Sequence, residues 1–128
     1  MREIDDQTVA YTLVAQTCFE DLKQAASQLA GLLVMEAAGS KAPDHPMLAS
    51  ARQAHLKAAD GLRRAQVPAQ ARNHHRHLTA AAARLNEALQ AGCDPLPMLE
   101  SAYRELRAAS HALPGFRMIS FERGCCAK

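Results

Sequence analysis

The stretch that decides the fold is IDDQTVAYTLVAQTCFEDLKQAASQLAGLLVME, residues 4–36. Mostly apolar or small residues recur in it at alternating spacings of three and four, which is typical of a helix face packed against partner helices. This stripe consists of Ile4, Thr8, Tyr11, Ala15, Cys18, Leu22, Ala25, Leu29, Leu32 and Glu36. No proline interrupts the stretch. It therefore predicts one long helix against which the rest of the chain packs.

Capping and helix-breaking residues divide the remaining chain into three further helices. Gly39 is expected to end the first helix in the left-handed conformation, Asp44 and Asp94 to cap the second and fourth, and Pro68 to begin the third. The predicted helices cover residues 5–38, 45–66, 68–91 and 95–112, followed by a tail over residues 113–128. Because no polar cap precedes Pro68, the second and third helices could instead form one long kinked helix, which would favour an intertwined dimer.

The fold class predicted from these elements is all-α, with residues 1–128 forming one domain. Short turns between four helices predict an antiparallel up-down-up-down four-helix bundle. The first helix is the longest, so its first turns should overhang the end of the bundle where the fourth helix finishes. We expect the apolar tail to pack on that end as an extension, near Tyr11 and Phe19.

Each shorter helix has an apolar stripe of its own. In the second, the stripe is Leu48, Ala51, His55, Ala58, Leu62 and Ala65; in the third, Ala71, His74 or His75, Leu78, Ala81, Ala82, Leu85 and Leu89; in the fourth, Leu96, Leu99, Tyr103, Leu106, Ser110 and Leu113. These stripes predict that Leu22, Leu62, Leu85 and Leu106 face a common core. His55 is expected to be a core histidine bonded to a neighbour, and Cys18 a small core residue.

Composition narrows the classes of function. A net charge of +2 is too small to indicate a nucleic-acid partner. The longest nearly unbroken apolar run, residues 29–35, is far shorter than a membrane-spanning helix. The start of the chain has no apolar signal segment, so we expect a soluble cytoplasmic protein with reduced thiols. The 27 alanines predict close helix packing with modest stability, and hence a homodimer that uses an Ala/Leu-rich helix face.

Two short stretches are candidates for metal or redox chemistry. His74 and His77 are three residues apart, so on a helix two imidazoles could hold one transition metal such as zinc or copper, with a third ligand from elsewhere. His75 is expected on a different face, nearer the core. Cys125 and Cys126 are adjacent thiols that could bind a soft ion or form a disulfide. The alternative interpretation is a solvated helix start and a frayed chain end.

No motif nominates a catalytic residue, because the chain has no P-loop, no glycine-rich dinucleotide loop, no H-E-x-x-H and no G-x-S-x-G. The leading hypothesis is a non-enzymatic helical interaction or structural module that self-associates, with no catalytic or cofactor-binding residue assigned. The alternative is a metal-binding or redox-sensing bundle that uses His74, His77, Cys125 and Cys126.

Overall fold

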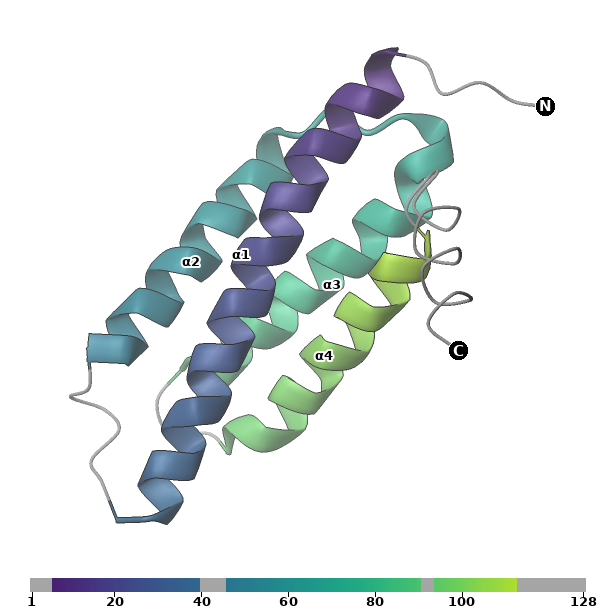
Figure 1. The fold of residues 1–128 in the computed structure, drawn as a ribbon. Coiled ribbons are helices and arrows are strands. Elements are labelled where there is room, and N and C mark those ends of the chain that lie inside the picture. The colour runs from purple at the N-terminus through teal and green to yellow at the C-terminus, as the bar shows by residue number, and fades with distance from the viewer. Residues whose placement is uncertain (1–5, 40–45, 91–93, 113–128) are drawn as a thin grey trace, which may run out of the picture.

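A computed structural model describes residues 6–39, 46–90 and 94–112, and all regular structure in these ranges is helical. The four helices are α1 (Asp6–Ala37), α2 (Pro46–Arg64), α3 (Arg72–Ala88) and α4 (Pro95–Ala112), and a short 3-10 helix, η2 (Ala69–Ala71), precedes α3. Figure 1 shows α1 running along the whole length of the molecule, with its amino end beside the connection from α2 to α3. The predicted tail, residues 113–128, lies outside the described residues, so its expected packing stays a prediction.

The ends of the helices follow the expected capping residues in two places. Gly39 has φ of +104°, and its N–H donates to the Glu36 carbonyl at 3.0 Å, as expected for a glycine that ends a helix. At the start of α4 the Asp94 carboxylate accepts a hydrogen bond from the Leu96 N–H at 3.2 Å. Both predicted caps are therefore confirmed.

The second and third helices are separate, as predicted, but the third begins later than expected. Residues 65–68 are not helical, which excludes the alternative of one long kinked helix. Pro68 adopts an extended conformation, and α3 begins at Arg72, after the turn of η2. Neither Pro68 nor Ala71 provides a side-chain cap. The uncapped first turn therefore takes the tighter 3-10 geometry that is common at helix ends.

The core consists largely of the predicted stripes. All members of the α1 stripe between Thr8 and Leu32 are buried, as are Leu62, Leu85 and Leu106 in the other helices. Ile4 lies outside the described residues, and Glu36 is exposed. Most of the core is leucine and alanine, which agrees with the close packing that the composition predicts.

The stripe predicted for α4 was partly wrong. The side chains of Leu96 and Tyr103 are 52% and 40% exposed. The buried face of α4 instead consists of Leu99, Ala102, Leu106 and Ala109. The helix packs mainly along α3, and its alanines allow a close approach that a tyrosine would prevent. The bulky ring of Tyr103 is therefore turned toward the side of α1.

The four helices pack as two pairs. Contacts between α1 and α2 and between α3 and α4 are extensive, whereas contacts from one pair to the other are far fewer. In the α1–α2 contact, Gly61 of α2 faces Cys18 of α1. A Cβ atom added to Gly61 would lie 2.8 Å from the sulfur of Cys18, so the missing side chain makes room for the buried thiol. None of the helices in the described ranges is long and apolar enough to span a membrane.

Candidate functional site

A buried polar cluster joins the amino end of α1 to the start of α3. The Tyr11 hydroxyl lies 2.8 Å from Nδ1 of His74, and the two rings meet edge to face with centroids 5.6 Å apart. One turn earlier, Oγ1 of Thr8 accepts a hydrogen bond from the Gln70 amide at 2.5 Å. These contacts connect residues more than sixty positions apart in the sequence. They fix how the two helix pairs meet at this end.

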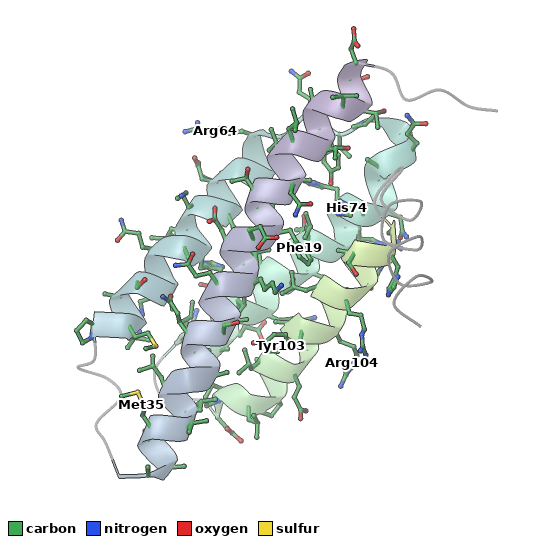
Figure 2. All side chains as sticks on the ribbon, in the orientation of Figure 1. Phe19, Met35, Arg64, His74, Tyr103 and Arg104 are labelled. Atoms are coloured by element: carbon green, nitrogen blue, oxygen red, sulfur yellow. The ribbon has the colours of Figure 1, made fainter. Side chains whose placement is uncertain are left out.

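The prediction of which histidine, His74 or His75, lies nearer the core was wrong. His75 was expected nearer the core, but His74 is the buried residue, with 3% of its surface exposed, and His75 is only partly buried. The reason is helical phase, because His74 shares its face with Leu78 and Leu85, which are fully buried. Figure 2 shows His74 between α1 and α3. The Nδ1 atom of His75 has no hydrogen-bond partner among the described residues.

The Tyr11–His74 pair is uncharged at neutral pH. Burial, with smaller contributions from the charges of His75 and His77, lowers the pKa of His74 to about 4. Burial, with a smaller contribution from Cys18, raises the pKa of the Tyr11 hydroxyl above its ordinary value. A general base works best with a pKa close to the working pH. The pair is therefore better suited to holding two helices together than to transferring protons.

His77 lies on the same helix but contacts a different partner. Its Nδ1–H donates to the Glu105 carboxylate at 2.7 Å, which links α3 to α4. His74 and His77 thus bond to α1 and to α4 respectively. The described residues contain no group of three or more His, Cys, Asp or Glu side chains placed to hold a metal ion. Cys125 and Cys126 lie outside the described residues, and the metal hypothesis stays a prediction.

The two core residues singled out in the sequence lie where they were expected. His55 is buried, and its Nε2–H donates to the Ala82 carbonyl at 2.9 Å, so the prediction of a hydrogen-bonded core histidine is confirmed. Cys18 is a buried free thiol. Burial, with a smaller contribution from Asp21, raises the pKa of this thiol, which keeps it protonated and unreactive.

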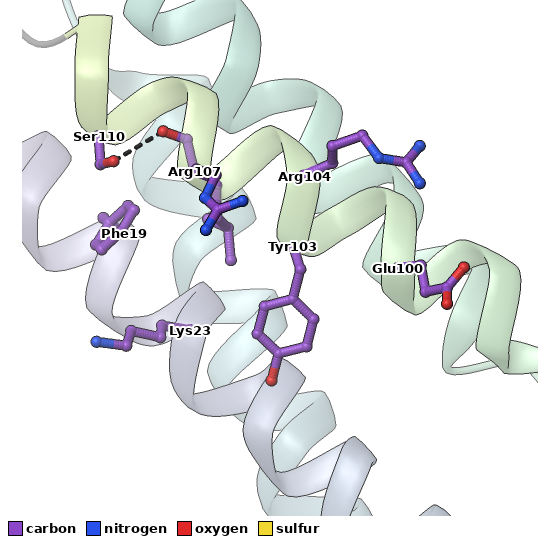
Figure 3. A pocket seen from close by; sticks show the side chains of 8 residues that line it. Phe19, Lys23, Glu100, Tyr103, Arg104, Arg107 and Ser110 are labelled. Carbon is purple, nitrogen blue, oxygen red and sulfur yellow. Dashed lines mark hydrogen bonds between the residues drawn. The ribbon is translucent and has the colours of Figure 1, made fainter.

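A groove between α1 and α4 was not predicted from the sequence. Its volume is about 620 Å³, and its lining combines apolar and charged side chains: Phe19, Lys23, Glu100, Tyr103, Arg104, Leu106, Arg107 and Ser110. Figure 3 shows Phe19 and Tyr103 projecting into the space between the two helices. Contacts between α1 and α4 are few, as they are elsewhere between the two helix pairs.

A smaller groove of about 480 Å³ lies between α1 and the end of α2, beside Tyr11, Val14 and Gly61. Arg64 is the one cation in its lining.

Comparison of the chain with family models, with curated proteins and with solved structures finds no match.

Proposed function

We propose that the protein is a non-enzymatic helical interaction module that self-associates, with the cytoplasm as its expected location. The proposal includes an antiparallel up-down-up-down arrangement of the four helices, with residues 113–128 packed on the end of the bundle where α4 finishes. The observation that carries the proposal is an apolar patch on α1, formed by Val9 and Leu13, whose side chains are 47% and 67% exposed.

Three hydrogen bonds support the antiparallel arrangement, because each joins a late position of one helix to an early position of another. The Gln28 amide near the end of α1 donates to Ser50 in the first turns of α2 at 3.0 Å. The Arg52 guanidinium in α2 donates at 3.0 Å to the carbonyl of Leu89, which follows α3. The His77–Glu105 bond joins the start of α3 to the later half of α4.

The packing of residues 113–128 on this end is supported by where α4 finishes. Ser110 in the last turn of α4 lies in the same groove as Phe19 of α1. The following segment contains Phe116, Met118, Ile119 and Phe121. Apolar residues in this number gain free energy when they leave water, so they are expected to cover apolar surface at this end of the bundle, beyond the groove.

Self-association is proposed through the α1 apolar patch and not through the alanine-rich stripes. The stripes are buried within one chain, so they are not available to a second chain. Val9 and Leu13 are one helical turn apart and point away from the core. In a two-fold dimer both copies contribute this same surface to the interface. Large apolar side chains exposed next to each other are typical of protein interfaces.

Leu13→Glu is expected to convert a dimer into a monomer. Burial of one leucine contributes roughly 2 kcal/mol, and a carboxylate in the same place opposes association, so the dimer dissociation constant should rise at least about thirtyfold. Light scattering at tens of micromolar should give twice the chain mass of 13.8 kDa for the wild type and the single chain mass for the variant.

The matched control is Leu56→Glu, because Leu56 on α2 is 66% exposed and the substitution is the same. This variant should remain a dimer. A monomeric wild type would contradict the proposal of self-association. Dissociation of the dimer by Leu56→Glu but not by Leu13→Glu would place the interface on α2 and contradict the assignment to α1.

A further inference from the structure

The floor of the groove between α1 and α4 is apolar. Phe19 from α1 and Tyr103 and Leu106 from α4 form it, and the buried side of Leu106 continues into the core. Figure 3 shows the two aromatic rings on opposite sides of this floor, one from each helix. A volume of about 620 Å³ falls in the size range of small-molecule sites.

Cations surround this apolar floor. Lys23 lies one turn after Phe19 on α1, and Arg107 lies one turn after Tyr103 on α4. Both line the groove, and Figure 3 shows Arg107 above the space between the helices and Lys23 below it. Arg104 adds a third positive charge at the outer edge. Glu100 is the one carboxylate in the lining, and Figure 3 shows it nearer the start of α4, away from Phe19.

These cations differ from most others in the described part of the chain. Arg63, Arg64 and Arg84 are each paired with a carboxylate, and Lys57 lies at 4.0 Å from one. Arg52 and Arg76 donate to a backbone or side-chain oxygen. In contrast, Lys23, Arg104 and Arg107 form no ion pair with any described residue. Their positive potential is therefore directed to the groove and the solvent next to it.

We propose that this groove binds an elongated amphiphilic anion, namely an alkyl carboxylate of the fatty-acid class. The alkyl chain contacts Phe19, Tyr103 and Leu106, and the carboxylate forms charge-assisted hydrogen bonds with the cations of the rim, Lys23 and Arg107. This inference does not depend on self-association, because the α1 apolar patch contributes no residue to the groove.

An alkyl carboxylate and the chain's own final segment are two possible occupants of the groove, and they differ in charge. The apolar residues from Phe116 to Phe121 could cover the floor, but the one charge among them is Arg117, which a cationic rim repels. An alkyl carboxylate matches both the floor and the rim. Charge complementarity therefore favours the anion as the occupant.

The experiment is calorimetric titration of the full chain with sodium decanoate below its micelle concentration at neutral pH. We expect saturable binding with one site per chain, at least about tenfold weaker binding of decan-1-ol, and none of decyltrimethylammonium. The double variant Lys23→Met/Arg107→Met keeps the aliphatic stems and removes both charges, and it should bind decanoate about tenfold more weakly. The matched control, Arg84→Met, removes one charge outside the groove and should bind like the wild type.

A second measurement locates the ligand. The chain has two tyrosines, and Tyr103→Phe assigns their ring signals in NMR spectra. Decanoate should shift the ring signals of Tyr103 and leave those of Tyr11 unchanged. Equal affinity for decanoate and decan-1-ol, or equal affinity of the double variant and the wild type, would overturn the proposal. If decanoate binds only to the variant Phe116→Ser/Phe121→Ser, the final segment occupies the groove in the wild type. If decanoate halves the mass of the protein, a second copy of the chain occupies the groove. Either outcome also overturns the proposal.

Discussion

Lowering the pH from 7 to 4 is expected to reduce the free energy of unfolding by about 3 kcal/mol through His74 alone. The pKa of His74 is lowered from 6.5 to about 4 in the folded protein, so between these values the unfolded chain binds the extra proton and the folded chain does not. The contribution of the neutral ring is complete above pH 6.5 and is lost as the pH falls toward 4. The physical cause is burial of the ring against Tyr11.

The measurement is urea unfolding of the wild type and of His74→Gln at pH 7 and at pH 4. Glutamine does not titrate and can still bond to the Tyr11 hydroxyl, so the difference between the two pH values should be about 3 kcal/mol smaller in the variant. His111→Gln changes an exposed histidine in the last turn of α4 and should keep the wild-type difference. The same pH dependence in His74→Gln and the wild type would show that His74 is not the group responsible.

Gly61→Ala is expected to destabilise the protein by up to about 2 kcal/mol. Alanine has the higher helix propensity, which by itself would stabilise α2 by about 1 kcal/mol. At Gly61, however, the new Cβ atom would lie 2.8 Å from the Cys18 sulfur, and the thiol is enclosed by the core. Overpacking of this kind forces a side chain or a helix to shift and typically costs about 1–3 kcal/mol, so it outweighs the propensity. Thermal or urea unfolding measures the change.

Cys18→Ala should reverse the sign of this effect. Once the sulfur is absent, Gly61→Ala should be neutral or should stabilise by up to about 1 kcal/mol, which gives a coupling energy of about 2 kcal/mol between the two sites. Gly31→Ala is the control on α1, because its nearest neighbour, the Met47 sulfur, would lie at a comfortable 3.8 Å. That variant should be slightly stabilised. Additive effects of Cys18→Ala and Gly61→Ala would contradict the proposed contact.

Helical periodicity was sufficient to predict the core of the longest helix. The alternating spacing from Thr8 to Leu32 assigned the buried face of α1, because a rigid helix repeats its orientation every 3.6 residues. The same reasoning placed Cys18 and His55 in the core. In a long stripe, one atypical residue does not change which face of the helix is predicted to be buried.

The same rule was less successful in the shorter helices. In α4 both a stripe through Tyr103 and a stripe through Ala102 fit the spacing, and the choice depends on how closely α3 approaches. In α3 the rule left His74 and His75 open and His75 was expected nearer the core, whereas the four-residue spacing to Leu78 puts His74 on the buried face. The groove could not be predicted, because it results from the turn of Tyr103 away from the core.

The uneven packing of the four helices has a consequence for how the molecule opens. Extensive contact within each pair and little between them makes α1 with α2, and α3 with α4, candidate cooperative units of partial unfolding. Backbone amides within one unit should then exchange with deuterium together. Separation of the units would bring the Tyr11–His74 bond into water and remove the burial that keeps the imidazole uncharged, so acid should loosen the junction before it melts either unit.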